Sequence, residues 1–545
     1  MRDRACVAVV TVRANSVGYL PDRAKRATVL GAASAFDAKT EDGEVVFSGD
    51  LPPAKESRET GELLTVADFS ELTTPGRYYV EVPGAGRSPV FEIGDNVFRE
   101  PLEALMLGIY GQRCGTEVSF EFKGNHFHHG ECHMKDASLQ QATNESSIKP
   151  ATGGWHDAGD YGKYTVNGGF AVAMLLKAWE HFRDKLEGVE FQMPERGGEV
   201  PDILDEAKFQ VDWVLTMQFD DGSAAHKVSG LDFEGMGVSP EGDGAPRYFS
   251  KQSTAAAAHV VAVAAQAARI FEEYDPDYAA KCLEAAQKSW AYLEANPDSV
   301  QAPQGSFGLM QYNTNDPDDR LWALAELWET TGEPALLAKL EEQLSARNVR
   351  MNWDWPDVEN LGFYTYALSR HASQEDGDPR SPDVVAEVEA SLIASGDQVV
   401  NNAVNHEYGR GIGGMYYWGI NGVIARVTMN LQVAHQLTGD DKYLDAGVQQ
   451  LDHLLGRNYY SRSQVTGVGY DPPRAPHHRP SVADRVSAPW PGLLVGGSNQ
   501  DPEAPDDNPY ASATSWRDAS DDYRTIEVAI NWSTAMIYAL AGFQP

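Results

Sequence analysis

The hydrophobic and polar positions change their period once along the chain, near Asn96. Before that point, short β-branched and aromatic runs alternate with turn residues: the runs include 27–30, 44–47 and 76–82, and the turns include 41–43, 74–76 and 83–84. Regular short strands separated by turn signals are typical of a β-sandwich. The pattern therefore predicts an all-β domain over residues 1–95.

After Asn96 the apolar residues recur with a helical period, beginning with Leu102, Leu105, Met106 and Ile109. Including this stripe, the pattern predicts about twelve helices, over 98–112, 168–184, 201–218, 253–273, 277–295, 318–331, 334–346, 358–370, 383–395, 419–438, 441–456 and 524–541. Short turns join several of them into pairs, and several are strongly apolar. We expect helical hairpins closed into a ring over residues 96–545.

Three long polar segments interrupt the helices, over 113–167, 297–317 and 457–523. They are too long to be passive connections in a compact domain. We therefore expect them to carry the functional site.

The composition changes this picture little. The chain has 545 residues, of which 42% are hydrophobic and 23% charged, as in a soluble globular enzyme of more than one domain. No run approaches the 18 apolar residues of a membrane span, so no membrane partner is expected. The N-terminal apolar run is short and lacks a small-residue cleavage site, which predicts either a cytoplasmic protein or a secreted one that has lost its leader.

The charge is more informative: 80 acidic against 44 basic residues give a net charge of −36. Such a field repels phosphate backbones, so we expect no nucleic-acid partner. The acidic residues are spread along the chain. They indicate either adaptation to high salt or an ordinary acidic bacterial enzyme. The sequence leaves the oligomeric state open, and a monomer is favoured.

Two acidic segments are candidates for catalysis. Asp157 and Asp160 stand three residues apart among glycines before an apolar helix, and together could hold a water and raise its basicity. Glu527 stands at the start of the apolar stretch that runs to Leu540, where desolvation would raise its pKa toward that of a general acid. Each also fits a structural role, because acidic residues commonly cap helices and occupy their first turn.

Two further groups carry potential chemistry. His477-His-Arg479 lies in a Pro-rich loop and could bind sugar hydroxyls, or could be a solvated basic loop. Cys114, Cys132, His133 and His156 would suit structural zinc, with His126, His128 and His129 as competing ligands. A Cys114–Cys132 disulfide and two free thiols are the alternatives. With Cys6 and Cys282, the chain has four cysteines, too few for a disulfide scaffold.

In order along the chain, these segments resemble glycoside hydrolase family 9, the cellulase family with an (α/α)6 barrel, in its branch with an N-terminal immunoglobulin-like domain. The resemblance covers essentially the whole chain. It rests on Asn15-Ser-Val-Gly-Tyr-Leu-Pro21, Gly153 through Tyr164, Val200 through Glu206, Leu455 through Asn458, Val465 through Arg479, and Asp518 through Trp532.

The resemblance implies a mainly α fold and an inverting cleavage of β-1,4-glucans. Asp160 would be the general base, Asp157 would help to hold the attacking water, and Glu527 would be the general acid. The resemblance adds His477 and Asp518 to the catalytic set and Arg479 to the sugar contacts. It also raises the case for zinc on Cys114, Cys132, His133 and His156, and implies calcium without placing its ligands.

Three positions depart from the family pattern: Arg320, Ile420 and Ile526. They do not change the catalytic carboxylates, but they put in doubt which residues line the substrate cleft and therefore which sugar it binds. Trp155, Tyr161 and Trp418 are candidate stacking platforms for the sugar, although core packing is the commoner role of any one of them. The alternatives to an endoglucanase are an exo-acting glycosidase on cello-oligosaccharides or glucosamine oligosaccharides, and a non-catalytic sugar-binding protein.

Overall fold

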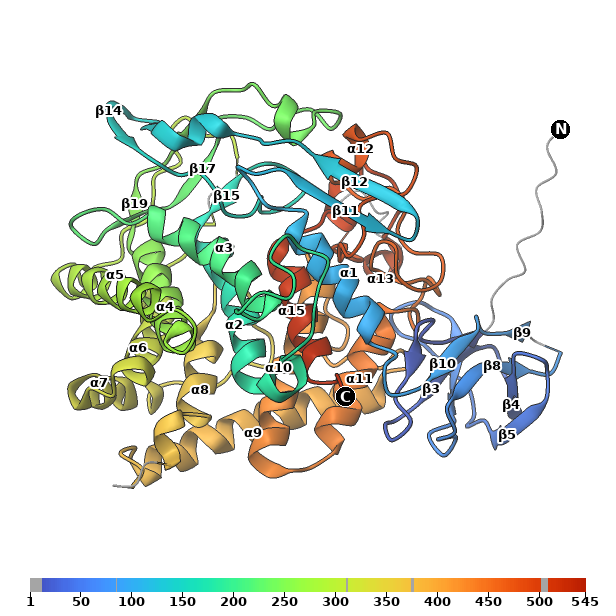
Figure 1. Ribbon diagram of the computed structural model, residues 1–545. Coiled ribbons are helices and arrows are strands. Elements are labelled where there is room, and N and C mark those ends of the chain that lie inside the picture. The colour runs from blue at the N-terminus through green and yellow to red at the C-terminus, as the bar shows by residue number, and fades with distance from the viewer. Residues whose placement is uncertain (1–11, 85, 310–311, 374–376, 501–507) are drawn as a thin grey trace.

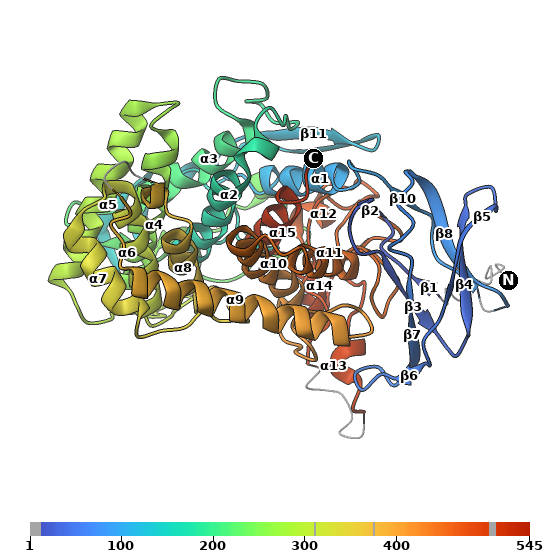
Figure 2. The same ribbon diagram turned by 90° about the horizontal axis from the view of Figure 1, so that it is seen from below.

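The computed structural model describes residues 12–545 apart from 85, 310–311, 374–376 and 501–507. It has a small β-sandwich followed by a large ring of helices, and Figures 1 and 2 show the sandwich lying to one side of the ring, next to α11. This is the mainly α architecture, a β-sandwich before an (α/α)6 barrel, that the sequence predicts.

Two sheets form the sandwich. One has the order β1-β3-β7-β6 and the other the order β2-β10-β8-β4-β5, with β9 paired to β8. All pairings within them are antiparallel except that of β10 with β2. The strands span Val12–Arg13 (β1), Gly18–Tyr19 (β2), Arg26–Leu30 (β3), Ala35–Thr40 (β4), Val45–Asp50 (β5), Lys55–Glu56 (β6), Leu63–Asp68 (β7), Gly76–Val82 (β8), Gly86–Arg87 (β9) and Phe91–Ile93 (β10).

Alternating residues of these strands point inward and form a core separate from that of the helices. At its centre, the ring of Tyr19 lies edge-on to Phe69 and Phe91, with centroids 5.2 and 4.9 Å away. The first long helix starts at Arg99. The predicted boundary between residues 95 and 96 falls in the connection between the two parts and stays a prediction.

The described residues contain twelve longer helices, which form an inner ring of six and an outer layer of six. The inner ring follows the order α2, α4, α6, α8, α10 and α15, and an outer helix packs on each: α3, α5, α7, α9, α11 and α1. The inner helices span Thr165–Leu186 (α2), Thr254–Phe271 (α4), Pro317–Thr331 (α6), Glu359–Ala367 (α8), Ile420–Thr438 (α10) and Ile530–Ala541 (α15). The outer helices span Arg99–Tyr110 (α1), Asp202–Thr216 (α3), Pro276–Ala295 (α5), Pro334–Leu344 (α7), Pro382–Asn405 (α9) and Lys442–Leu454 (α11).

The inner helices are buried on nearly all sides, whereas outer helices such as α5 and α9 bury one face. Inner helix α4 is rich in alanine, which lets its neighbours approach closely. Ser253 caps its N-terminus, where the serine hydroxyl accepts a hydrogen bond from the Ala256 N–H at 3.0 Å. Between α8 and α10 the ring is closed by a hydrogen bond from the Tyr364 hydroxyl to Asn430, at 2.6 Å.

By length and composition α4 could also span a membrane, with a mean hydropathy of 1.3. Because 94% of that window is buried inside the protein, packing against α2, α5 and α6 accounts for its apolar character.

The predicted continuous helix over 524–541 is wrong at one point. A short helix α14, Tyr523–Ile526, is followed by extended backbone at Glu527, and α15 begins only at Ile530. The main chain between them pairs with other segments instead of continuing the helix: Val528 bridges to Val495, and Ala529 to Ala158. Helix α9 also runs further than predicted, to Asn405.

The remaining strands and short α-helices lie in the polar segments 113–167 and 457–523 and in the connection between α3 and α4. A five-stranded sheet has the order β14-β13-β18-β17-β15, and β11-β12 and β16-β19 form two smaller sheets. The strands span Val118–Phe122 (β11), Asn125–His129 (β12), Leu139–Gln141 (β13), Asn144–Lys149 (β14), Lys163–Tyr164 (β15), Ala224–Ala225 (β16), Lys227–Gly230 (β17), Arg247–Phe249 (β18) and Gln252–Ser253 (β19); Arg479–Ala483 (α12) and Ala511–Thr514 (α13) are short helices.

Candidate active site

Three segments far apart in sequence are joined by their main chains at the site. His477 forms a parallel bridge with Glu527 and Ala158 an antiparallel one with Ala529. The Arg479 N–H donates to the Gly159 carbonyl at 3.1 Å. A Cβ on Gly159 would lie 1.9 Å from the His477 carbonyl oxygen, so only glycine allows this approach. Backbone pairing therefore brings the loops of Asp160 and His477 together with the acid candidate Glu527.

Asp157 is buried, 1% exposed, and held on both oxygens. Asn167 donates to one oxygen at 2.7 Å and the Tyr312 hydroxyl to the other at 2.9 Å. Burial raises the pKa of Asp157 to about 7 in spite of these two bonds. Since α2 starts after Tyr164 with no side-chain cap, the helix-capping alternative for Asp157 and Asp160 is wrong.

Asp160 lies next to Asp157 at the centre of the acidic groups. Its carboxylate is 6% exposed and accepts a 3.3 Å hydrogen bond from the Gly162 N–H. Its charge contributes to the raised pKa values of Asp157, Glu527 and Tyr164. The two acidic segments predicted from the sequence therefore interact electrostatically.

Glu527 is held in extended backbone rather than in a first helical turn, which excludes the helix-dipole alternative. Burial raises its pKa to about 8, with a further contribution from the charge of Asp160. The Trp418 indole N–H donates to its carboxylate at 3.0 Å and partly opposes that rise. At neutral pH Glu527 is therefore protonated and able to donate a proton.

The His477 ring is fixed by a 2.7 Å bond from Nδ1 to the Ser520 carbonyl oxygen. A carbonyl only accepts, so Nδ1 carries the proton and Nε2 is left as an acceptor in the neutral ring. Burial lowers the pKa of His477, which favours that neutral form. His478 and Arg479 are 1% and 4% exposed, so this segment is not a solvated basic loop.

Asp518 and Arg479 mainly contact protein groups. Asp518 accepts from Arg462 at 2.7 Å and from the N–H groups of Arg474 and Ala475 at 3.0 and 2.9 Å, which orders the loop leading to His477. Arg479 donates to the carbonyl oxygen of Gly159 at 2.7 Å and to that of Glu234 at 2.9 and 2.8 Å. A direct catalytic role for Asp518 and a sugar contact for Arg479 stay predictions.

The candidate aromatic platforms differ in exposure. Trp155 and Tyr161 are 1% and 0% exposed, and their polar atoms bond Glu206 and the Val238 carbonyl, which favours core packing. Trp418 is 44% exposed beside Glu527. Tyr523, 50% exposed, lies 5.5 Å from the Trp418 ring and 6.0 Å from the His477 ring.

Sequence reasoning missed Tyr523 as an aromatic candidate, and also Asn167 and Tyr312. Asn167 had a signal, because it is a polar residue in an apolar helix. Tyr312 had none, since its loop has no period. The departures at Ile420 and Ile526 do not change the exposed surface that a sugar could contact, because these side chains are 1% and 0% exposed. Arg320 bonds Asp316 and the Leu293 and Asn296 carbonyls.

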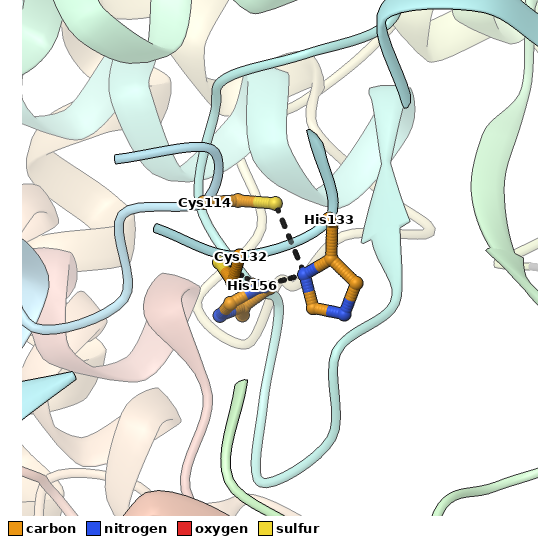
Figure 3. Close-up of side chains that lie close together, drawn as sticks. All are labelled: Cys114, Cys132, His133 and His156. Carbon is orange, nitrogen blue, oxygen red and sulfur yellow. Dashed lines mark hydrogen bonds between the residues drawn. The ribbon is translucent and has the colours of Figure 1, made fainter. Parts of the chain in front are cut away.

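The four predicted metal ligands converge (Figure 3). One ligand atom from each of Cys114, Cys132, His133 and His156 lies within 4.8 Å of the other three, and all four residues are buried. Nδ1 of His133 lies 3.5 Å from the Cys114 sulfur and 3.3 Å from Nε2 of His156, which lies 4.0 Å from the Cys132 sulfur. A tetrahedral S2N2 zinc site would have edges of roughly 3.3–3.8 Å, so two of these three distances lie in that range and the third, 4.0 Å, is slightly longer.

Other features of this cluster also fit a metal. Asp243 contacts Nε2 of His133 at 3.1 Å, which would orient the ring as in carboxylate–histidine–metal sites. Cys114 and Cys132 are not joined by a disulfide, so the disulfide alternative is wrong. Cys6 lies outside the described residues. Of the competing histidines, His126 and His128 are exposed and His129 bonds the Gly130 carbonyl.

Comparison with known proteins identifies the family. The sequence model of the family described as "Glycosyl hydrolase family 9" matches residues 98–540. The model described as "Cellulase N-terminal ig-like domain" matches residues 9–87. The chain belongs to glycosyl hydrolase family 9. It is therefore a glycoside hydrolase, which confirms the resemblance and removes the non-catalytic alternative.

Relatives match over nearly the whole chain. Endoglucanase D of Acetivibrio thermocellus is 44% identical over 537 residues, which cover 98% of this chain and 83% of that protein. The crystal structure of a metagenome-derived family 9 endoglucanase has a TM-score of 0.89 and 33% identity, and covers 98% of both chains. A Zn-binding triple mutant of the family 9 endoglucanase J30 has a TM-score of 0.89 and 31% identity, covering 96% of this chain and 99% of that one.

Proposed function

We propose that this glycoside hydrolase cleaves β-1,4-linked glucans within the chain and with inversion of the anomeric centre. The observation that carries the proposal is a buried acid beside a second carboxyl group on a separate loop. Glu527 has a pKa of about 8 and is protonated at neutral pH, and the charge of Asp160, from the loop that pairs with the acid segment, contributes to that rise. The similarity to endoglucanases supports the substrate class.

In the proposed reaction, Asp160 takes a proton from a water molecule while the water oxygen bonds to the anomeric carbon. The bond from that carbon to the leaving oxygen breaks, and Glu527 gives its proton to that oxygen. Asp157, fixed by Asn167 and Tyr312, helps to hold the water. Asp160 ends protonated and Glu527 ends ionised, so proton exchange with solvent restores both.

The exposed rings of Trp418 and Tyr523 are suited to contact pyranose faces near the acid. His477 would accept a hydrogen bond from a sugar hydroxyl at Nε2. We place Arg479 and Asp518 as the residues that hold the loops of Asp160 and His477.

The test uses Glu527→Gln and Asp160→Asn with cellohexaose. Each variant removes one proton-transfer group with little change of shape, and we expect kcat to fall by roughly a hundredfold or more while sugar binding persists. Asp521→Asn is the matched control, because Asp521 is exposed on the same segment as the acid. Full activity of either active-site variant would contradict its assignment.

Product analysis separates endo from exo action. Early release of fragments of several lengths from cellohexaose and carboxymethylcellulose is expected for the proposed enzyme. Release of a monosaccharide alone from one end, or cleavage of chitosan oligomers in place of glucans, would support the exo-acting alternative.

We also propose that Cys114, Cys132, His133 and His156 hold a structural zinc ion. The donor set of two thiols and two imidazoles, its burial and its close spacing support zinc over metals that prefer oxygen ligands. His156 directly precedes Asp157, so a metal here would stabilise the loop that carries both aspartates. Calcium stays a prediction without assigned ligands.

A further inference from the structure

A fourth acidic side chain, Glu234, lies buried beside the proposed catalytic groups. It belongs to the loop that follows β17, where its neighbour Phe233 is 59% exposed. The Glu234 side chain itself is only 3% exposed. Neither carboxylate oxygen has a hydrogen-bond partner among the described residues. Because burying a carboxyl without a hydrogen-bond donor is costly, this residue calls for an explanation.

The sheet brings Glu234 toward the base candidate. Strands β15 and β17 are antiparallel, with Lys163 opposite Val228. This register places the residues before β15, which include Asp160, beside the residues after β17, which lead to Glu234. Sequence patterns do not reveal the approach, since each loop lies outside the strands.

Arg479 connects the two loops. Its Nε and Nη2 donate to the Glu234 carbonyl oxygen, and its Nη1 and backbone N–H donate to the carbonyl oxygen of Gly159, directly before Asp160. The Arg479 Nε also lies 3.6 Å from the Glu234 carboxylate, and its guanidinium carbon 5.7 Å from the centre of the Phe233 ring. One guanidinium therefore couples Glu234 to the position of the base.

The groups that act on Glu234 are mostly acidic. Burial raises its pKa, as do the charges of Asp160 and Asp243, whereas Arg479 lowers it. The charge of Glu234 in turn raises the pKa values of Tyr161, Tyr164 and Arg247. Asp160 and Glu234 are thus acidic groups that repel each other, and the Arg479 guanidinium lies beside the Glu234 carboxylate while it bonds the carbonyl directly before Asp160.

We propose that Glu234 is a positioning residue for the reaction: through Arg479 it fixes the loop of Asp160, and its buried charge strengthens that residue as a base. The inference rests on the proposed role of Asp160. Glu234 itself takes no proton from the water and forms no bond with the sugar. A nearby negative charge makes protonation of Asp160 more favourable, which is what a base needs when it removes a proton from water.

The experiment is the pH dependence of kcat and KM for cellohexaose in Glu234→Gln. The substitution keeps the main-chain carbonyl that binds Arg479 and removes only the charge. The acidic limb of the kcat/KM profile is the fall in activity at low pH, where the base becomes protonated. We expect this limb to move down by roughly half to one pH unit. We also expect kcat to fall several-fold and KM to stay nearly unchanged. A purely structural role would alter stability or kcat without moving that limb.

Two further variants complete the test. Glu234→Asp keeps the charge, so its acidic limb should stay near that of the natural enzyme even if the shorter side chain lowers kcat. Asp232→Asn makes the same charge change at an exposed position of the same loop and should leave the profile unchanged. Glu234→Asp decides the question if Glu234→Gln does not fold. A shift of its acidic limb by as much as half a pH unit would overturn the proposal, whereas an acidic limb at the position of the natural enzyme would support it.

The outcomes separate this inference from the proposed function. If the natural enzyme does not cleave cellohexaose, or if Asp160→Asn stays active, the proposed function fails. If those two results are as expected but the limb of Glu234→Gln coincides with that of Asp232→Asn, only the role of Glu234 is overturned.

Discussion

At the scale of single residues, the chemistry follows from how each carboxyl is surrounded. Glu527 receives one indole N–H and lies near other carboxylates, so burial and repulsion keep it protonated at neutral pH. Asp157 receives two side-chain donors and is nevertheless raised to a pKa of about 7 by burial. Neither value could be predicted from the immediate sequence neighbours, since Trp418 and Tyr312 donate from distant segments and Asn167 from the helix that follows Asp157.

Trp418→Phe tests whether the indole N–H of Trp418 influences the pKa of Glu527. The Trp418 N–H stabilises ionised Glu527, so its removal should raise the pKa of Glu527. The basic limb of the kcat profile should therefore move up by roughly half a pH unit, and KM should rise if the indole contacts the sugar. A pH titration of cellohexaose hydrolysis measures both effects.

Trp290→Phe is the matched control, because Trp290 lies half-buried on α5, away from the acid. Its profile should coincide with that of the natural enzyme. A basic limb that stays in place, or moves down, in Trp418→Phe would contradict this account of Glu527.

At the scale of elements, most of the secondary structure was predicted from the period of the hydrophobic positions. This pattern located all twelve longer helices of the described residues, because the outer helices bury one stripe that leaves a visible period and the inner helices form long apolar stretches bounded by turn residues. It failed at Glu527, where bridges from Ala158 and Val495 interrupt an apolar stretch that reads as one helix. The contributions of Tyr312 and Glu234 were equally hidden, because irregular loops position them.

The cysteine–histidine cluster was predictable in composition but not in geometry. Its ligands come from the segment after helix α1, from the loop after β12 and from the segment before Asp157. A metal there would therefore join three irregular segments that few helix contacts stabilise.

His133→Ala tests the cluster. We expect zinc content, measured by mass spectrometry, to fall from about one ion per chain to near zero. At a zinc concentration about a thousandfold above Kd, loss of binding would cost about 4 kcal/mol of stability. The melting temperature and kcat should both fall, since the same loop holds Asp157 and Asp160.

His128→Ala provides the comparison, since His128 is an exposed histidine on the neighbouring strand β12. It should keep both zinc and activity. Retention of a full zinc ion by His133→Ala, or its absence from the natural protein as purified from zinc-supplemented cells, would refute the assignment.

At the scale of the whole molecule, the β-sandwich is tied to the barrel near the acid. Glu59 accepts from His406, Arg410 and Tyr416 at 3.0, 3.1 and 2.5 Å. The same segment continues to Trp418, which bonds Glu527. Burial alone would raise the pKa of Glu59, but the His406 hydrogen bond and the nearby charges lower it to about 2.

Glu59→Gln should destabilise the protein. Lowering of the Glu59 pKa from 4.5 to about 2 corresponds to roughly 3 kcal/mol. A lowered carboxyl pKa stabilises the fold above the ordinary value of 4.5, and this stability is lost as pH falls toward about 2. The melting temperature of the variant should thus be a few degrees below that of the natural enzyme at neutral pH, and the gap should close on acidification.

The control is Glu56→Gln, an exposed glutamate on β6. Thermal unfolding of the three proteins from neutral to acidic pH measures the effect. An equal melting temperature of Glu59→Gln and the natural enzyme at neutral pH would show that the contact does not stabilise the domain interface.

The net charge of −36 acts over the whole surface. Repulsion among acidic groups opposes the compact state and weakens as the Debye length falls from about 10 Å at 0.1 M salt to about 3 Å at 1 M. The melting temperature at neutral pH should therefore rise with KCl. If the charge is an adaptation to salt, as we expect, the rise should continue beyond about 1 M, where screening is nearly complete. An ordinary acidic enzyme would reach a plateau before that concentration.

The control is the same measurement near pH 4.7, the isoelectric point, where the net charge vanishes. The change of melting temperature at low salt should vanish there as well. A change as large as that at neutral pH would show that the salt effect does not arise from net charge.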